Sequence, residues 1–284
     1  MNCSLKRFGQ RGDGGKSVCL SADGSGFWAA RAQSSCLVYS FGIRDDWTFD
    51  LAMRDRGCEV HSFDPTIGER PPKKPKNVNF HPIGLGAADG DRINVEASRT
   101  GSERANGELG QLFTLHSIRK RLGHLGRHIT LIKMDVESAE WGVLPQLLKT
   151  KVEQVLVELH YYDGRRGRQI DEAYRTGLVG CGYWGSSGCP GNMNVCRKRE
   201  HSPLPSTVSK WASVMQQFRA AGWQLTHAIA NPWSSVLDSA ASLEAARNAS
   251  GSVAEFPDDS QFFLCCYEVG FVRTVSRTTT LYEM

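Results

Sequence analysis

Three carboxylates lie close together in the segment Leu131–Trp141, which reads LIKMDVESAEW. A short apolar run ends at Asp135, and Glu137 and Glu140 follow it. Such a run is typical of a buried strand in a parallel sheet, and open α/β sheets bind ligands beyond the carboxyl ends of their strands. The pattern therefore favours a functional site here. The structural alternative is that both glutamates only place negative charge at the start of the next helix.

Two earlier segments also combine a short apolar run with a residue suited to ligand binding. The run Cys36–Phe41 is followed by Gly42, and glycine lets the backbone approach a ligand closely. The run Glu59–Phe63 is followed by Asp64, at roughly the twenty-residue spacing at which nucleotide-binding α/β folds place an acid on ribose hydroxyls. Together with Asp135, these strand ends predict an adenosine-binding site.

The order of the predicted elements indicates an α/β fold. Apolar runs predict strands at 36–41, 59–63, 78–80, 91–95, 129–134 and 152–159. Helical spacing and caps predict helices at 48–56, 112–122 and 143–148, and glycines predict a turn at 84–90. This alternation favours right-handed βαβ units and a mostly parallel sheet.

The remaining sequence is expected to complete one domain over residues 1–284. We predict a helix at 208–221 and two late strands, 223–230 and 261–272, which pair antiparallel. Residues 1–33 are rich in glycine and poor in apolar residues, which predicts a loop-rich lead-in. Residues 163–206, rich in Gly, Arg and Cys, are expected to form an insertion above the strand ends.

Composition excludes some function classes. The chain has 284 residues, of which 40% are hydrophobic and 23% charged, as is ordinary for a globular protein. The net charge is +4, and no Lys/Arg block is long enough to predict nucleic-acid binding. No apolar run approaches the ~20 residues that a membrane-spanning helix needs. We therefore expect neither a nucleic-acid partner nor a membrane span.

The cellular compartment is left open by two opposing features. The N-terminal segment MNCSLKRFGQRGDGGK has no apolar stretch typical of a signal peptide, which predicts a cytoplasmic protein for the sequence as written. Nine cysteines are many for an intracellular enzyme, so the secretory pathway is expected instead if a leader precedes this sequence. Cys181, Cys189 and Cys196 could hold a disulfide or a metal, although their spacing matches no standard site.

The ordered motifs resemble one family of methyltransferases. They are YSFGIRDDWTFDLAM, GCEVHSFDPTIG, LIKMDVESAEW, VLVELH and CYEVGFVR. In content and order they are similar to the FkbM-like methyltransferase-domain family. The resemblance covers residues 3–164 and 208–275. It implies a Rossmann-like class I methyltransferase fold, with a seven-stranded, mostly parallel sheet, an antiparallel last strand and helices on both faces. It also implies S-adenosyl-L-methionine as the cofactor.

The resemblance assigns cofactor contacts to the first two strand ends. Phe41, Gly42 and Ile43 would form the loop under the methionine part of the cofactor. Asp64 would bind the ribose hydroxyls, and Pro65 would shape the turn that follows.

The resemblance also places the reactive part of the site. The turn that contains Leu85 would lie near the adenine, and Asp135, Glu137 and Glu140 would lie beside the transferred methyl group and its acceptor. The first loop departs from the wider class, because it lacks an acidic residue before the glycine and a second glycine after it. Asp46, or its neighbour Asp45, could supply the missing charge to the cofactor ammonium group.

Methyl transfer to a hydroxyl also needs a group that accepts the hydroxyl proton. Asp135 and His160 end neighbouring predicted strands and are candidate bases, with Glu137 as a third candidate catalytic residue. His160 could equally be a structural histidine. The acid-rich set around it, which includes Glu140 and Glu158, could hold a divalent ion, but the pattern does not show one and we predict no metal. The family resemblance favours a small-molecule or glycan hydroxyl as the acceptor.

The sequence also contains features that bear on three other functions. The fold could persist as a catalytically inactive binding or scaffold protein, a possibility that the atypical first loop favours. The segment GQRGDGGKS resembles a phosphate-binding P-loop, but Gln10 stands where that motif needs glycine and no strand is predicted before it. A dinucleotide-dependent dehydrogenase is disfavoured because no GxGxxG follows the first strand.

Overall fold

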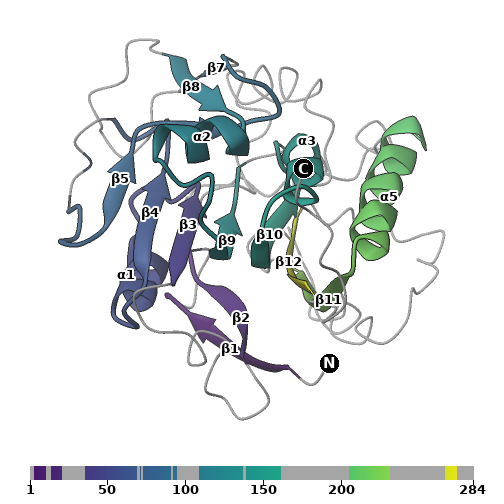
Figure 1. Ribbon diagram of the computed structural model, residues 1–284, viewed down its shortest axis with the longest axis horizontal. Coiled ribbons are helices and arrows are strands. Elements are labelled where there is room, and N and C mark those ends of the chain that lie inside the picture. The colour runs from purple at the N-terminus through teal and green to yellow at the C-terminus, as the bar shows by residue number, and fades with distance from the viewer. Residues whose placement is uncertain are drawn as a thin grey trace, which may run out of the picture.

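The computed structural model shows an α/β fold built around one large sheet (Figure 1). It describes residues 3–10, 14–20, 36–68, 71, 73–90, 92–94, 109–136, 139–160, 205–230 and 266–273. The strands are β1 (Ser4–Phe8), β2 (Lys16–Leu20), β3 (Leu37–Phe41), β4 (Glu59–Phe63), β5 (Asn79–His81), β6 (Gly84–Leu85), β7 (Arg92–Asn94), β8 (Leu109–Phe113), β9 (Ile129–Met134), β10 (Val152–His160), β11 (Trp223–Ala230) and β12 (Cys266–Arg273). The helices are α1 (Thr48–Arg54), α2 (Leu115–Arg121), α3 (Glu140–Leu147) and α5 (Pro205–Ala220).

The large sheet has seven strands in the order β11-β12-β10-β9-β3-β4-β5. The strands β3, β4, β5, β9 and β10 run parallel, whereas β12 is antiparallel to both of its neighbours. From β3 the chain builds outward through β4 and β5, then returns to β9 on the other side of β3. The strand order therefore reverses between β3 and β9, where α/β sheets of this kind bind ligands.

Two apolar layers cover the sheet, because successive side chains of a strand point to opposite faces. Tyr39 and Phe41 of β3 lie in the layer formed with α2, α3 and α5. Val38 of the same strand lies in the other layer, with Phe49 and Met53 of α1. Helices thus cover both faces, as predicted. No described helix is both long and apolar enough to cross a membrane.

The expected loop-rich lead-in is wrong for ten residues, which form an antiparallel hairpin of β1 and β2. Phe8, Val18 and Leu20 are buried in the same layer as α1, and Cys3 is bonded to Cys19. Figure 1 shows the hairpin below the sheet, and β2 lies against β10 and β12. The local sequence did not reveal these strands because each is five residues long and its stability depends on this packing.

Three element boundaries also differ from the prediction. The helix predicted at 112–122 begins at Leu115, because Thr114 is extended and its hydroxyl accepts a hydrogen bond from Ser117 N at 3.2 Å. The residues before Thr114 form β8, which pairs with β6 in the segment predicted as a turn. The helix predicted from residue 143 begins at Glu140. The other predicted strands and helices are present within a few residues of their expected bounds.

Several predictions lie outside the described residues. They include Glu137, the three cysteines 181, 189 and 196, the first residues of the strand predicted at 261–272, and all but the last two residues of the insertion predicted at 163–206.

Candidate functional site

Backbone hydrogen bonds tie together the carboxyl ends of β3, β4 and β9. Gly42 N donates to Phe63 O at 3.0 Å, and Asp135 N donates to Phe41 O at 3.2 Å. The buried Lys133 adds a third link, since its Nζ donates to Gly42 O at 3.1 Å. The residues that follow these strands therefore lie side by side at one edge of the sheet.

Gly42 is required by the close approach of two strand ends. Its φ is +70°, a left-handed conformation that glycine adopts readily. A Cβ atom at this position would collide with the carbonyl oxygen of Asp135. The backbone after β3 thus turns beside β9 without a side chain.

Asp64 joins the loop after β3 to the turn after β4. Its carboxylate accepts hydrogen bonds from Arg44 N at 2.7 Å and from Thr66 N at 2.7 Å, and its exposed fraction is 2%. Pro65 is buried, and a Cβ at Gly84 would lie 2.9 Å from its ring. The turn predicted to lie near the adenine is therefore packed against the end of β4.

Three other predicted cofactor residues contribute through backbone or packing. The side chains of Phe41 and Leu85 are buried in the layer with α2 and α3, and that of Ile43 in the layer with α1. Phe41 stacks on Phe63 with ring centroids 4.5 Å apart. These buried side chains support the loop. At these three positions only backbone atoms are available to a ligand at the strand ends.

Asp46 connects the loop after β3 to the N-terminal hairpin. Its Oδ1 accepts from Thr48 N at 2.9 Å, and its Oδ2 accepts from Gln10 Nε2 at 2.5 Å. A Cβ at Gly14 would collide with the same carboxylate. Gln10 and Gly14 of the N-terminal segment thus lie against Asp46.

A buried glutamate–histidine pair lies beside Asp135. His160 Nδ1 is 2.9 Å from Glu140 Oε1, which also accepts from Val136 N at 3.1 Å. A carboxylate only accepts hydrogen bonds, so this contact assigns a proton to Nδ1, and in the neutral form of the ring Nε2 is the basic nitrogen. His160 Nε2 is 4.0 Å from Asp135 Oδ1 and 4.0 Å from Glu158 Oε1. This geometry suits a base near the strand ends.

Glu140 therefore has a more specific place than the sequence suggested. It was predicted to lie beside the transferred methyl group, whereas the structure places it against the ring nitrogen of His160 that faces away from Asp135. Its side chain is fully buried. Figure 1 shows α3, which begins at Glu140, next to the end of β10, where His160 lies.

Lys16, the first residue of β2, is a charged member of this cluster that sequence reasoning missed. Its Nζ is 2.7 Å from Glu158 Oε2 and 3.9 Å from Asp135 Oδ2, and only 1% of the residue is exposed. Burial lowers the pKa of Lys16, but the carboxylates of Asp135, Glu158 and Glu268 outweigh this and raise it above its ordinary value. The available signal was the lysine directly after the glycines of GQRGDGGK.

The structure weighs against a metal ion at either candidate group among the described residues. Asp135, Glu158 and His160 offer ligand atoms within 4.8 Å of one another, but the Lys16 ammonium already pairs with both carboxylates. The second group is Glu59, His61 and His124. There Arg127 donates to both Glu59 and His124, and supplies the positive charge itself.

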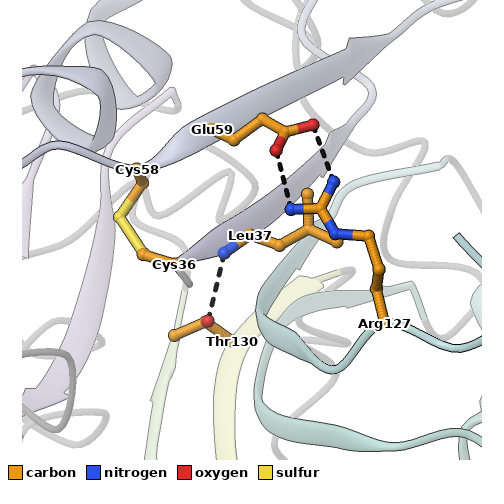
Figure 2. Close-up of a disulfide and its surroundings, with 6 residues drawn as sticks. All are labelled: Cys36, Leu37, Cys58, Glu59, Arg127 and Thr130. Carbon is orange, nitrogen blue, oxygen red and sulfur yellow. Dashed lines mark hydrogen bonds and ion pairs between the residues drawn. A yellow bond between two sulfur atoms is a disulfide. The ribbon is translucent and has the colours of Figure 1, made fainter. Parts of the chain in front are cut away.

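The amino ends of β3 and β4 are clamped by a disulfide and an ion pair (Figure 2). Cys36 and Cys58, each one residue before its strand, are bonded to one another. Arg127 donates to the two oxygens of Glu59 at 2.9 and 2.7 Å, which, with burial opposing it, lowers the pKa of Glu59 to about 2. Leu37 N donates to Thr130 Oγ1 at 3.1 Å. The ends opposite the candidate site are therefore held rigidly.

The chain is similar to a known protein family and to two known proteins. A family model described as "Methyltransferase domain" matches residues 1–177. The chain is 30% identical over 132 residues to "Probable methyltransferase-like protein 24" of Homo sapiens, a match that covers 45% of this chain and 33% of that protein. It is also 30% identical over 150 residues to the protein of the same name from Rattus norvegicus, covering 51% and 38%.

The matched part spans about a third of the human relative's length, 33%. The family match extends over more than half of this chain and includes β1 to β10 with the strand ends described above. The chain therefore belongs to the methyltransferase-domain family.

Proposed function

We propose that this chain is an S-adenosyl-L-methionine-dependent methyltransferase that methylates a hydroxyl group of a small molecule or glycan. The observation that carries the proposal is the convergence of Gly42, Asp64 and Asp135 at the point where the strand order reverses. Family membership supports methyl transfer as the reaction class. When bound, the cofactor supplies a methyl group activated by a sulfonium.

The residues at the strand ends fit such a cofactor. Gly42 lets the end of β3 turn directly beside Asp135, because any side chain there would collide with the Asp135 carbonyl oxygen. Asp64 Oδ1 accepts from Thr66 N and Thr66 Oγ1, whereas Oδ2 accepts from Arg44 N and has a further lone pair for a ribose hydroxyl. Pro65 and Leu85 would shape the adenine side. Phe41 and Ile43 would support the loop under the methionine part, with Asp46 beside it.

The candidate base is His160, with Glu140 behind it and Asp135 in front. Glu140 holds the proton on Nδ1, so Nε2 is suited to take a proton from an acceptor hydroxyl. Asp135, whose side chain is 15% exposed, would contact the acceptor or relay its proton. The role predicted for Glu137 stays a prediction.

We further propose that the protein acts in an oxidising compartment such as the secretory pathway. The pairs Cys3–Cys19 and Cys36–Cys58 support this, because structural disulfides persist where thiols are oxidised. Non-reducing peptide mapping of the protein isolated from its native cells should recover the peptide linked through Cys36 and Cys58. Two free thiols at these positions would contradict the proposal.

Isothermal titration tests the cofactor assignment. The full chain is expected to bind S-adenosylmethionine and S-adenosylhomocysteine but not NAD. Asp64→Ala should weaken binding about tenfold or more, because charged hydrogen bonds to the ribose are lost. The matched control is Asp89→Ala, since the exposed Asp89 likewise accepts hydrogen bonds from a backbone N–H and a hydroxyl group of the chain, those of Thr114 N and Ser117 Oγ.

Absence of binding of both sulfur compounds would favour the scaffold alternative over an enzyme. If binding is found, a screen of small-molecule and glycan acceptors with labelled cofactor identifies the substrate. Label transferred to nitrogen rather than oxygen would overturn the assignment of a hydroxyl acceptor.

A further inference from the structure

The N-terminal hairpin places a cation inside the proposed active site. Lys16 comes from outside the strand-end motifs, yet its Nζ is closer to Glu158, at 2.7 Å, than His160 Nε2 is, at 4.0 Å. It is also 3.9 Å from Asp135, which lies 4.0 Å from His160 Nε2. Lysine is almost never buried to this degree unless it is paired, so its position requires an explanation.

We propose that Lys16 is a positioning residue for the candidate base. Its ammonium group is a built-in cation that offsets part of the negative charge of Asp135 and Glu158, and so favours the uncharged form of His160, which can accept a proton. The proposal rests on the function proposed above. It gives the N-terminal segment a role in the chemistry, because Lys16 supplies a positive charge that Gly42, Asp64 and Asp135 at the strand ends do not carry.

The charges near His160 explain why a cation would help. Among the described residues, the ring nitrogens of His160 lie 2.9–4.0 Å from carboxylate oxygens of Asp135 after β9, Glu158 on β10 and Glu140 on α3, and Lys16 on β2 pairs with Asp135 and Glu158. Three carboxylates around one imidazole favour its protonated form, which cannot act as a base. A fixed positive charge close to two of these carboxylates opposes that effect.

The hairpin holds the ammonium in place through Glu268 of β12. Ser17 N donates to Glu268 Oε1 at 2.6 Å, and Arg7 donates to Oε2 at 3.0 Å. Burial raises the pKa of Glu268, but His227, Lys16, Ser17 N and Arg7 outweigh it and lower that pKa to about 2. Glu268 therefore stays charged and anchors the residue next to Lys16. The position of Nζ is thus defined on both sides, by Glu268 through the backbone and by Glu158 directly.

The test is an NMR titration of the full chain labelled with ¹³C at histidine Cε1, which needs no acceptor. His160→Asn assigns the resonance. In Lys16→Met we expect the pKa of the His160 imidazole to rise by about one unit or more, because a nearby positive charge has been removed. In Glu158→Gln we expect it to fall. Lys6→Met, which removes an exposed lysine of β1, is the matched control and should leave it unchanged.

These outcomes separate the proposal from a purely structural role of Lys16. A structural role predicts the same His160 pKa in every variant that folds, and that result would overturn the proposal. If Lys16→Met does not fold, a Glu158→Gln variant in which the pKa of His160 is unchanged or raised would overturn it instead. Selective broadening of the His160 signal of the wild-type chain by Mn²⁺ would also overturn it, because a metal would then take the place assigned to Lys16. None of these readouts depends on cofactor binding, so they fail or succeed independently of the proposed function.

Discussion

A Cβ atom on Gly42 would overlap the main-chain carbonyl oxygen of Asp135, so the ends of β3 and β9 can meet only because residue 42 has no side chain. The two residues are 93 positions apart. Gly42 belongs to the loop that the family resemblance assigned to the cofactor. The resemblance placed Asp135 beside the transferred methyl group and its acceptor. This contact therefore couples the shape of the cofactor loop to the position of Asp135.

Gly42→Ala should destabilise the protein far more than its φ of +70° alone explains. Gly123→Ala is the matched control, because Gly123 has φ +71° and no atom would lie within 4 Å of its Cβ. The control is expected to cost about 1–2 kcal/mol, the usual penalty of a left-handed alanine. Thermal unfolding of both variants measures the difference. Equal losses of stability would show that the contact with Asp135 does not constrain this loop.

Glu140→Gln should weaken the buried pair with His160. Gln keeps the shape of the side chain but removes the charge on the acceptor of the 2.9 Å hydrogen bond. The free energy of unfolding is expected to fall by about 1.5–3 kcal/mol, as for hydrogen bonds to charged groups. Chemical denaturation measures this change.

Glu153→Gln is the control for that prediction. Glu153 Oε1 pairs with His128 Nδ1 at 3.1 Å, and both side chains are partly exposed. A pair of this kind contributes less than about 1 kcal/mol. A Glu140 variant no less stable than the Glu153 variant would argue against a tightly held His160.

Removal of the disulfide in Cys36→Ser/Cys58→Ser should lower stability without weakening cofactor binding. The cysteines are 22 residues apart, so the loop-entropy model predicts a loss of roughly 3 kcal/mol. Because the bond joins the amino ends of β3 and β4, the carboxyl ends should keep their arrangement. Urea unfolding and titration with S-adenosylhomocysteine check the two parts. A folded variant with lost affinity would show that the clamp shapes the site.

Acid should destabilise the protein through His81. Burial, followed by the nearby His61 and His124, lowers the pKa of His81 from 6.5 to about 4. The unfolded chain therefore binds the proton more readily than the folded chain between these values, and stability falls as the pH is lowered from 6.5 to about 4. The slope from one such group is at most about 1.4 kcal/mol per pH unit.

Urea unfolding across this pH range measures the effect. His81→Gln should flatten the dependence, whereas His116→Gln, at an exposed position on α2, should not. The same pH dependence in the wild type and in His81→Gln from pH 6.5 to 4 would contradict the prediction.

Much of the sheet and of the candidate site could be inferred before the structure was known. Gly42, Asp64 and Asp135 each follow an apolar run, and parallel strands present their carboxyl ends at one edge, so local sequence patterns were enough to bring the three together. The β1–β2 hairpin and β8 were missed. Each of the three strands β1, β2 and β8 has only five residues. This is too few to show an alternation of apolar and polar residues among the surrounding glycines and polar residues.

Three features became visible only in the folded chain. They are the place of Lys16 in the site, the pairing of Glu140 with His160, and the pairing of the cysteines. Lys16 and Glu158 are separated by 142 positions, and Glu140 and His160 by 20. Such contacts form because separate elements pack against a shared sheet, and no periodicity within one segment records which charges that packing brings together. Local sequence patterns thus identify the residues at the strand ends, whereas the charge balance around His160 depends on tertiary packing.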